Sequence, residues 1–386
     1  MSEPVANPCS WNKEWIDDFF SVTVPSVLPP EKVSQVTEEA CIQVAKQVLS
    51  TSDVRVVDVP GAASFTLISF KAGKVVQFRI AALDDDILEL AREIYGSLTP
   101  RIERLRRDGF PLPIYVADIA SGTSLTQVYE DPLPIDRPFP IIMLPRTVVD
   151  FAKFIAMGAH YPLPASHMDE WKKTTLHFLD RLWDSEPLAK VAPELLPIFN
   201  DIKAHFHLLE LLPCVLTHAD LGTLNLFGNK QDGSLTAVID WDHAVIRPFG
   251  TLIWSLYENF MACKPENEIV FYTHVLDDGR RAIGVLEDAF WTQLWRSLEG
   301  VLDPVAHGCA VRTAAAVGAV DRYLDLETLA EIEEAVEKKG VTDWRGINVH
   351  GFIRARGFIP ALPRIEDGVL RFGQGWGGFV DMLQNE

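Results

Sequence analysis

An aspartate and an asparagine stand five residues apart in the segment 216–225, and a further aspartate ends the apolar run 237–240. These residues are Asp220, Asn225 and Asp240. A carboxylate can accept the proton of an attacking hydroxyl, and amide and carboxylate oxygens are ligands that Mg²⁺ prefers. Phosphoryl transfer from a nucleotide uses this combination of groups. The pattern predicts a catalytic base at Asp220 and metal ligands at Asn225 and Asp240.

Each of these residues also has an ordinary structural explanation. Asp220 would sit in a loop, where an Asx turn is common, and Asn225 could cap a turn. Asp240 would emerge from a buried strand, where an unpaired carboxylate is costly and a metal ion would offset that cost. The occurrence of all three at this spacing favours the catalytic interpretation. Nearby, Asp242 is either a supporting acid or a solvated side chain, and the sequence leaves both open.

The pattern His218-x-Asp220-x-x-x-x-Asn225, followed by Ile239-Asp240, resembles the catalytic and metal loops of the aminoglycoside phosphotransferase and choline kinase superfamily. The chain looks most like the fungal-type proteins of that superfamily, and the resemblance spans residues 55–265. It implies ATP and Mg²⁺ as cofactors and a small molecule as phosphoryl acceptor. In such a protein His218 braces the catalytic loop through hydrogen bonds and transfers no proton.

Kinases usually carry a lysine on the third strand, which pairs with nucleotide phosphates and with a glutamate on a helix. Here that position holds Arg79. Arginine stays charged and binds carboxylates or phosphates through two donors. We expect Glu93 as its partner, with Glu89 one helical turn earlier as the alternative. The competing interpretation of this pair is a surface salt bridge.

Two further nucleotide contacts follow from the resemblance. The turn at residues 60–65 would approach the phosphates, and Ser64 with the backbone amides would contact them, although the turn contains only one glycine. The hinge at residues 116–120, which includes Asp118, would meet the adenine edge through its backbone. An ordinary edge strand is the alternative for this hinge.

The predicted fold is α+β, a bilobal protein-kinase-like fold with an antiparallel N-lobe sheet, one inserted helix and a mostly helical C-lobe. Residues 31–50 have the periodicity of one amphipathic helix, and residues 84–98 begin a second one with three acids. We divide the chain into an N-terminal extension and helix at 1–50, an N-lobe with the nucleotide-binding sheet at 51–120, a helical C-lobe with the catalytic and metal loops at 121–343, and a tail packed on the C-lobe at 344–386.

Composition narrows the classes of partner. The 386 residues carry a formal charge of −19, which argues against nucleic acid or an anionic membrane surface. The acidity favours either solubility alone or attraction of a cationic acceptor, and charge does not decide between them. Five scattered cysteines suggest no disulfide framework. With no signal peptide and no long apolar run, we expect a cytoplasmic protein, whose oligomeric state the sequence does not reveal.

Three hypotheses about function remain at this stage. The first is an ATP- and Mg²⁺-dependent kinase that phosphorylates a hydroxyl or amine of a small metabolite. The second is a kinase-fold binding or regulatory module, and the third is an ATP-independent reaction on a metabolite. Glu258 and Asp321 are either acidic contacts for a cationic acceptor or solvated side chains. The glycine pattern at 373–378 is no dinucleotide site, because the required helix and acid do not follow it.

Overall fold

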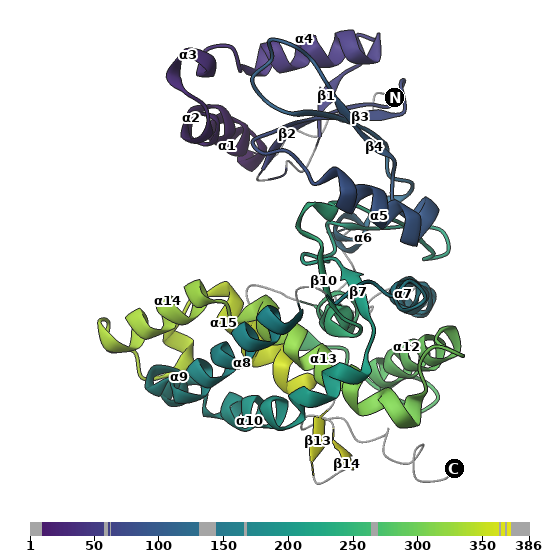
Figure 1. The fold of residues 1–386 in the computed structure, drawn as a ribbon, viewed down its shortest axis with the longest axis vertical. Helices are drawn as coiled ribbons and strands as arrows, with labels where there is room; N and C mark the ends of the chain where they lie inside the picture. Colours follow the sequence, from purple (N-terminus) through teal and green to yellow (C-terminus); the bar gives the residue numbers. More distant parts are fainter. Residues whose placement is uncertain are drawn as a thin grey trace. The chain divides into compact units, whose positions relative to one another are not determined.

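The computed structural model describes residues 10–57, 61, 63–130, 144–165, 168–263, 269–362, 364–366 and 369–371. The chain forms two compact units (Figure 1). The first contains Met1–Ser121 together with Ala237–Asp242, and the second contains Gly122–Thr236 and His243–Glu386. The segment 237–242, which the sequence placed with residues 121–343, is therefore grouped with the first unit. The glycine pattern at 373–378 lies outside the described residues.

A five-stranded antiparallel sheet organises the first unit, in the order β1-β2-β3-β5-β4. Its strands are β1 Arg55–Val56, β2 Ser64–Ser69, β3 Lys74–Arg79, β4 Ile102–Leu105 and β5 Ile114–Asp118. Helix α5, Asp85–Tyr95, is inserted between β3 and β4. Asp84 starts this helix by accepting hydrogen bonds from the amides of Asp86 and Ile87, at 3.0 and 3.2 Å.

Helices that precede the sheet bury its apolar face. Their bounds are α1 Ser10–Asp18, α2 Val24–Val27, α3 Pro30–Val33 and α4 Glu38–Leu49. Phe65 and Phe78 of the sheet are buried with Cys41 and Val44 of α4 in one apolar cluster. The single helix predicted over residues 31–50 is wrong. It is two helices, because Thr37 caps α4 by accepting a hydrogen bond from the amide of Ala40 at 3.1 Å.

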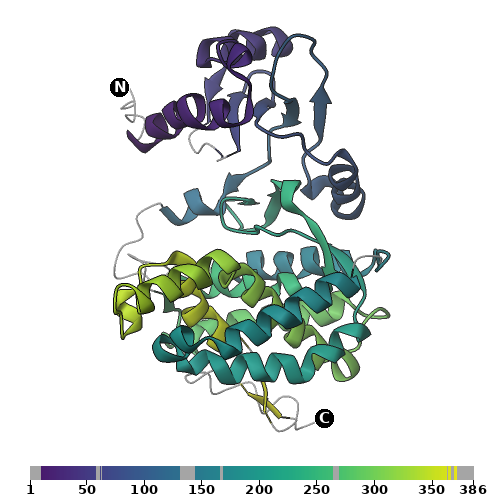
Figure 2. The same cartoon turned by 60° about the vertical axis from the view of Figure 1, so that its left-hand side comes forward.

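The second unit is mostly helical, and Figure 2 shows its helices packed side by side. Its helices are α6 Leu125–Glu130, α7 Leu144–Ala159, α8 Met168–Asp184, α9 Glu186–Val191, α10 Leu196–His205, α11 Trp254–Leu256, α12 Ala282–Ser297, α13 Pro304–Tyr323, α14 Leu326–Glu337 and α15 His350–Phe358. Phe151 of α7 and Phe290 of α12 contribute to the core, with ring centroids 6.3 Å apart. A π-helical segment, η7 Tyr257–Met261, follows α11 directly.

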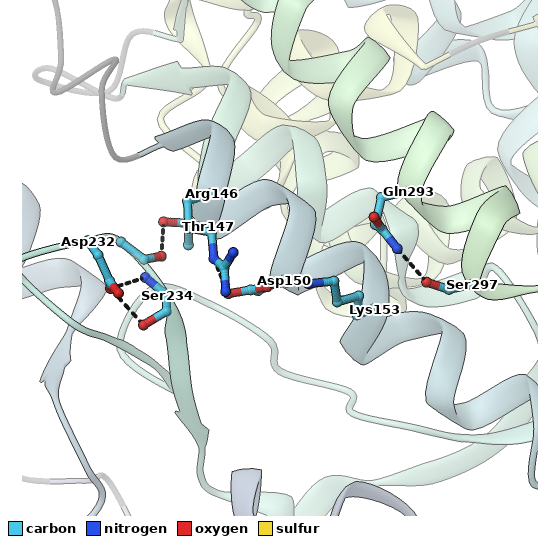
Figure 3. Close-up of polar contacts among 9 residues, drawn as sticks. Arg146, Thr147, Asp150, Lys153, Asp232, Ser234, Gln293 and Ser297 are labelled. Carbon is cyan, nitrogen blue, oxygen red and sulfur yellow. Dashed lines mark hydrogen bonds and ion pairs between the residues drawn. The ribbon is translucent and has the colours of Figure 1, made fainter.

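The remaining strands are short and carry loops, mostly of the second unit. They are β6 Thr123–Ser124, β7 Cys214–Thr217, β8 Leu226–Gly228, β9 Leu235–Val238, β10 Val245–Pro248, β11 Ala262–Cys263, β12 Val270–Phe271, β13 Arg364–Glu366 and β14 Val369–Arg371. The turn between β8 and β9 is fastened to α7, where the hydroxyl of Thr147 donates to the carbonyl of Gly233 at 2.6 Å. Within the same turn Asp232 accepts from the hydroxyl and amide of Ser234 (Figure 3).

The α+β class is confirmed, with an antiparallel sheet and one inserted helix in the first unit and a mostly helical second unit. This is the organisation that the kinase-like resemblance implied. Among the helices in the described part of the chain, none has both the length and the apolar character needed to cross a bilayer.

Candidate active site

The predicted catalytic loop begins where β7 ends. β7 pairs with β10, so that Thr217 lies opposite Val245, and this fixes the residue from which the loop departs. His218 is buried, and its Nδ1 accepts a hydrogen bond from the amide of Asp220 at 3.2 Å. His218 therefore braces the loop by a hydrogen bond, as the resemblance implied.

Asn225 closes the loop on itself. Its Nδ2 donates to the carbonyl of Asp220 at 2.8 Å, and its backbone amide donates to the carbonyl of Gly222 at 3.0 Å. Because the nitrogen end of the side-chain amide is used inside the loop, the Oδ1 atom is the end left for another partner. An oxygen is the atom that a hard cation such as Mg²⁺ requires. The donor chemistry of Asn225 thus fits the metal role predicted for it.

Neighbouring elements hold the middle of the loop in ways that the sequence did not indicate. Thr126 of α6 makes two hydrogen bonds to Thr223. The amide of Thr126 donates to the carbonyl of Thr223 at 3.2 Å, and the two hydroxyls share a hydrogen bond of 2.8 Å. The buried Asn259 of η7 donates its Nδ2 to the carbonyl of Leu221 at 2.8 Å. These contacts, made to the backbone and to a side chain, hold the loop that carries the Asp220 carboxylate.

The carboxylate of Asp220 has a partner that the sequence gave no reason to expect. Nη2 of Arg322, at the end of α13, donates to Asp220 Oδ1 at 2.6 Å across 102 residues of chain. The Asp220 side chain is 50% exposed and that of Arg322 29%. The guanidinium also lies over the ring of Trp254, with its central carbon 5.3 Å from the ring centroid. Half of the carboxylate surface thus remains open to a substrate.

In the first unit, Arg79 is the last residue of β3 and lies directly opposite Ser64 of β2. Its guanidinium forms an ion pair with Asp242 through Nη2, and Nη1 lies 3.9 Å from Oδ1 of Asp240. The side chains of Arg79 and Asp242 are only 6% and 9% exposed. Asp242 is therefore not solvated, which excludes one of the two alternatives that the sequence left open. It is half of a buried ion pair.

The expected pairing of Arg79 with Glu93, or with Glu89, is wrong. Both glutamates lie on the exposed face of α5. Tyr95 of that helix is buried and stacks on Trp241, with ring centroids 4.7 Å apart. Glu93, two residues earlier, points about 200° away around the helix. The stack also holds the segment 237–242 in the first unit, where its acids reach the guanidinium.

Asp240 has a backbone conformation that few residues other than glycine adopt. Its φ is +67°, in the left-handed region that aspartate tolerates better than most residues. The following Trp241 is buried and donates its Nε1 to the carbonyl of Val238 at 3.2 Å, which closes a tight turn. This turn leaves the Asp240 side chain 44% exposed beside a buried strand. An exposed carboxylate held on a tight turn is suited to act as an oxygen ligand of a metal ion.

The other predicted nucleotide contacts lie within the sheet. The Ser64 hydroxyl is buried and shares a hydrogen bond of 3.0 Å with that of Thr66. Asp118 pairs with Lys74 across the sheet at 2.5 Å, and its amide donates to the carbonyl of Arg101. Of the turn at 60–65, residues 60 and 62 lie outside the described residues. The roles of Ser64, Asp118 and Glu93 in nucleotide binding stay predictions.

The predicted site residues thus fall into two sets. The first unit brings Arg79 together with Asp240 and Asp242, and the second brings His218 together with Asp220 and Asn225. Among the described residues there is no cluster of three or more His, Cys, Asp or Glu side chains that could bind a metal by themselves.

A sequence model of the phosphotransferase enzyme family matches residues 72–286, more than half of the chain. The match includes Arg79, Asp220, Asn225 and Asp240 and ends before Arg322. A comparison with curated proteins gives no match.

Solved structures resemble the chain with low identity. They include a choline/ethanolamine kinase family protein from Mesorhizobium loti, at 12% identity and a TM-score of 0.44, covering 82% of this chain and 94% of that one. An ethanolamine kinase from Plasmodium vivax has 10% identity and a TM-score of 0.41, covering 91% and 89%. An aminoglycoside phosphotransferase from Streptomyces rimosus, in complex with ADP and streptomycin, has 14% identity and a TM-score of 0.40, covering 73% and 97%.

Proposed function

Because the chain belongs to the phosphotransferase enzyme family, we propose that it is an ATP- and Mg²⁺-dependent kinase that phosphorylates a small metabolite, on a hydroxyl or less often an amine. The observation that carries the proposal is the hydrogen-bonded loop at 218–225, which presents a half-exposed Asp220 carboxylate. A fixed, accessible carboxylate is what a hydroxyl acceptor needs for orientation and proton removal.

Each residue of the two sets has a role in this proposal. Asp220 accepts a hydrogen bond from the acceptor hydroxyl and orients its oxygen for attack. Asn225 offers its Oδ1 and Asp240 its carboxylate as ligands for Mg²⁺, and the bound metal ion would neutralise charge on the nucleotide phosphates. Arg79 holds the segment that carries Asp240, through its ion pair with Asp242.

The transfer step is a simple displacement at phosphorus. The acceptor oxygen forms a bond to the γ-phosphorus, and the bond from that phosphorus to the oxygen bridging it to ADP breaks. The hydroxyl proton passes to Asp220 and then to solvent, and ADP leaves with the electron pair of the broken bond. No oxidant or further reactant is needed.

The decisive variant is Asp220→Asn, which keeps the shape of the side chain and removes its charge. We expect acceptor-dependent ADP formation to fall by roughly 10²- to 10⁴-fold, because general-base catalysis contributes about that much. Nucleotide affinity, measured by calorimetry with Mg²⁺, should stay close to that of the unchanged protein, since Asp220 is proposed to contact the acceptor and not the nucleotide.

The same measurements separate the alternatives. A protein that binds no nucleotide in the presence of Mg²⁺ is not the proposed kinase. Nucleotide binding without any Asp220-dependent ADP formation would favour a binding or regulatory module. Conversion of a metabolite at equal rates with and without ATP would identify an ATP-independent reaction.

A further inference from the structure

Arg322 is not among the predicted site residues, but its guanidinium lies 2.6 Å from the Asp220 carboxylate. An acceptor hydroxyl that binds Asp220 must come within hydrogen-bond distance of the same carboxylate. Substituents one or two bonds from that hydroxyl are then within reach of Arg322. The charge of Arg322 therefore bears on the chemical class of the acceptor.

Arg322 is held in place by aromatic packing. Its guanidinium covers the buried ring of Trp254, which meets Tyr323 edge-on with ring centroids 5.7 Å apart. Stacking of this kind stabilises a guanidinium and limits its rotation. A guanidinium has five N–H donors. Among the described residues, the hydrogen bond that Arg322 makes is the one from Nη2 to Asp220, so donors remain for a second anion.

Glu258, one of the two acids that could attract a cationic acceptor, is already paired. Glu258 is only 3% exposed, forms an ion pair with Arg354 at 2.7 Å and accepts a hydrogen bond from the hydroxyl of Tyr323 at 2.9 Å. It is neither solvated nor free to bind an ammonium group, the two alternatives that the sequence left open. Asp321 is exposed, and the role that the sequence left open for it stays a prediction.

We propose that Arg322 is a specificity-determining residue, and that the acceptor is an alcohol with a carboxylate or phosphate group close to the hydroxyl that receives the phosphoryl group. This inference rests on the proposed kinase function. The inferred acceptor is anionic, whereas the net negative charge of the chain alone would suit a cationic acceptor. Arg322 also lies outside the region matched by the family model, so family membership does not account for it.

The chemistry of transfer is unchanged by this assignment. The hydroxyl oxygen bonds to the γ-phosphorus, the bond to the leaving ADP oxygen breaks, and the proton goes to Asp220 and then to solvent. The carboxylate or phosphate of the acceptor takes no part in bond changes. It would bind the free donors of Arg322 and so bring the hydroxyl to Asp220.

The test compares four sets of acceptors in an ADP-release assay with Mg²⁺ and ATP. The sets are hydroxy acids, sugar and polyol phosphates, neutral sugars and polyols, and cationic amino alcohols with aminoglycosides. The first two sets distinguish a carboxylate from a phosphate as the anionic group. We expect turnover with at least one acidic set and none with the cationic set.

Two variants assign the effect to Arg322. Arg322→Gln should raise KM for the acidic acceptor by about tenfold to a hundredfold, the usual worth of a charged hydrogen bond, with little change in KM for ATP. Arg322→Lys should recover part of the loss, because it keeps the charge. Arg356→Gln is a matched control, since Arg356 also pairs with a carboxylate, Glu194, and lies over a tryptophan ring. It should leave both KM values unchanged.

Several results would overturn the inference while leaving the kinase function intact. These are Asp220-dependent turnover of a cationic acceptor, turnover restricted to neutral acceptors, or a KM for the acidic acceptor that Arg322→Gln does not raise. Failure of both acidic sets to release ADP also overturns it. If the unsubstituted protein binds no nucleotide, the proposed function itself is rejected.

Discussion

The ion pair between Arg79 and Asp242 is the most consequential pairwise contact in the first unit. Both side chains are almost fully buried, so each charge offsets much of the desolvation of the other, and Asp240 is a second acid 3.9 Å from the guanidinium. A buried pair adds little net stability compared with an apolar pair of the same shape, but the loss of one partner leaves an uncompensated charge. The loss of stability should therefore be largest when only one of the two residues is substituted.

We predict that Arg79→Gln lowers the free energy of unfolding by about 3–5 kcal/mol, the usual cost of breaking a buried pair from one side. Adding Asp242→Asn should restore much of that loss, because the stranded charge is then gone. Urea unfolding of the two single variants and the double variant measures this in a double-mutant cycle. Additive effects of the two substitutions would contradict the pairing.

At this scale the sequence was informative only over short distances. The residues at 218–225 are close in the chain, so their spacing constrains their geometry, and the resemblance implied the contact of His218 with the loop. Arg79 and Asp242 are 163 residues apart, and Asp220 and Arg322 are 102. No local pattern encodes such pairs. They depend on tertiary packing, such as the stack of Tyr95 on Trp241, the residue next to Asp242.

Helix α13 packs closely against the backbone of the turn that leads into α11. A Cβ atom built on Gly318 would lie 1.8 Å from the carbonyl oxygen of Thr251, in the turn that leads into α11. Only a residue without a side chain permits this contact. The approach matters for the site because α13 carries Arg322 at its end.

We predict that Gly318→Ala destabilises the protein by roughly 3 kcal/mol, because the new methyl group meets backbone atoms that cannot rotate away. Gly284→Ala is the matched control in α12, where an added Cβ has no neighbour within 4 Å. It should stabilise by up to about 1 kcal/mol, since alanine favours helix more than glycine does. Thermal unfolding of both variants measures the difference, and equal melting temperatures would refute the close contact.

Elements whose ends are marked by the local sequence were predicted well. Other predicted helices are broken into shorter segments by caps and by tertiary packing. The acids at 84–86 marked the start of α5. The segment 251–261 is not one regular helix. It consists of a 3-10 turn, the short α11 and the π-helical η7. Here Gly250, with a φ of +99°, and the carbonyl of Thr251 facing α13 set the backbone path. Tertiary contacts of this kind are invisible to periodicity.

For the molecule as a whole, a buried acid couples folding to pH. Glu287 of α12 is buried, and Tyr257 donates its hydroxyl to Glu287 Oε1 at 2.7 Å. Burial raises the pKa of Glu287 from 4.5 to about 7, against the lowering effect of the Tyr257 hydrogen bond. The folded protein therefore binds this proton more tightly than the unfolded chain does.

The sign of the pH dependence follows from that difference. The stabilising contribution is complete below pH 4.5 and is lost as pH rises toward 7. The change amounts to about 3 kcal/mol. We predict that Glu287→Gln flattens the stability profile between those values, as measured by urea unfolding at several pH values. Replacing the exposed Glu331 of α14 by glutamine should leave the profile unchanged. A profile insensitive to Glu287→Gln would contradict this.

The left-handed backbone at Asp240 places the proposed metal ligation in conflict with the stability of the fold. Glycine adopts that conformation without the steric cost that any side chain bears, a difference of up to about 1 kcal/mol. A lineage or a laboratory screen that rewarded heat resistance alone would therefore drift toward glycine at this position and lose the proposed metal ligand. Under the proposed metal role, a carboxylate retained at this position would distinguish active relatives from inactive ones by sequence.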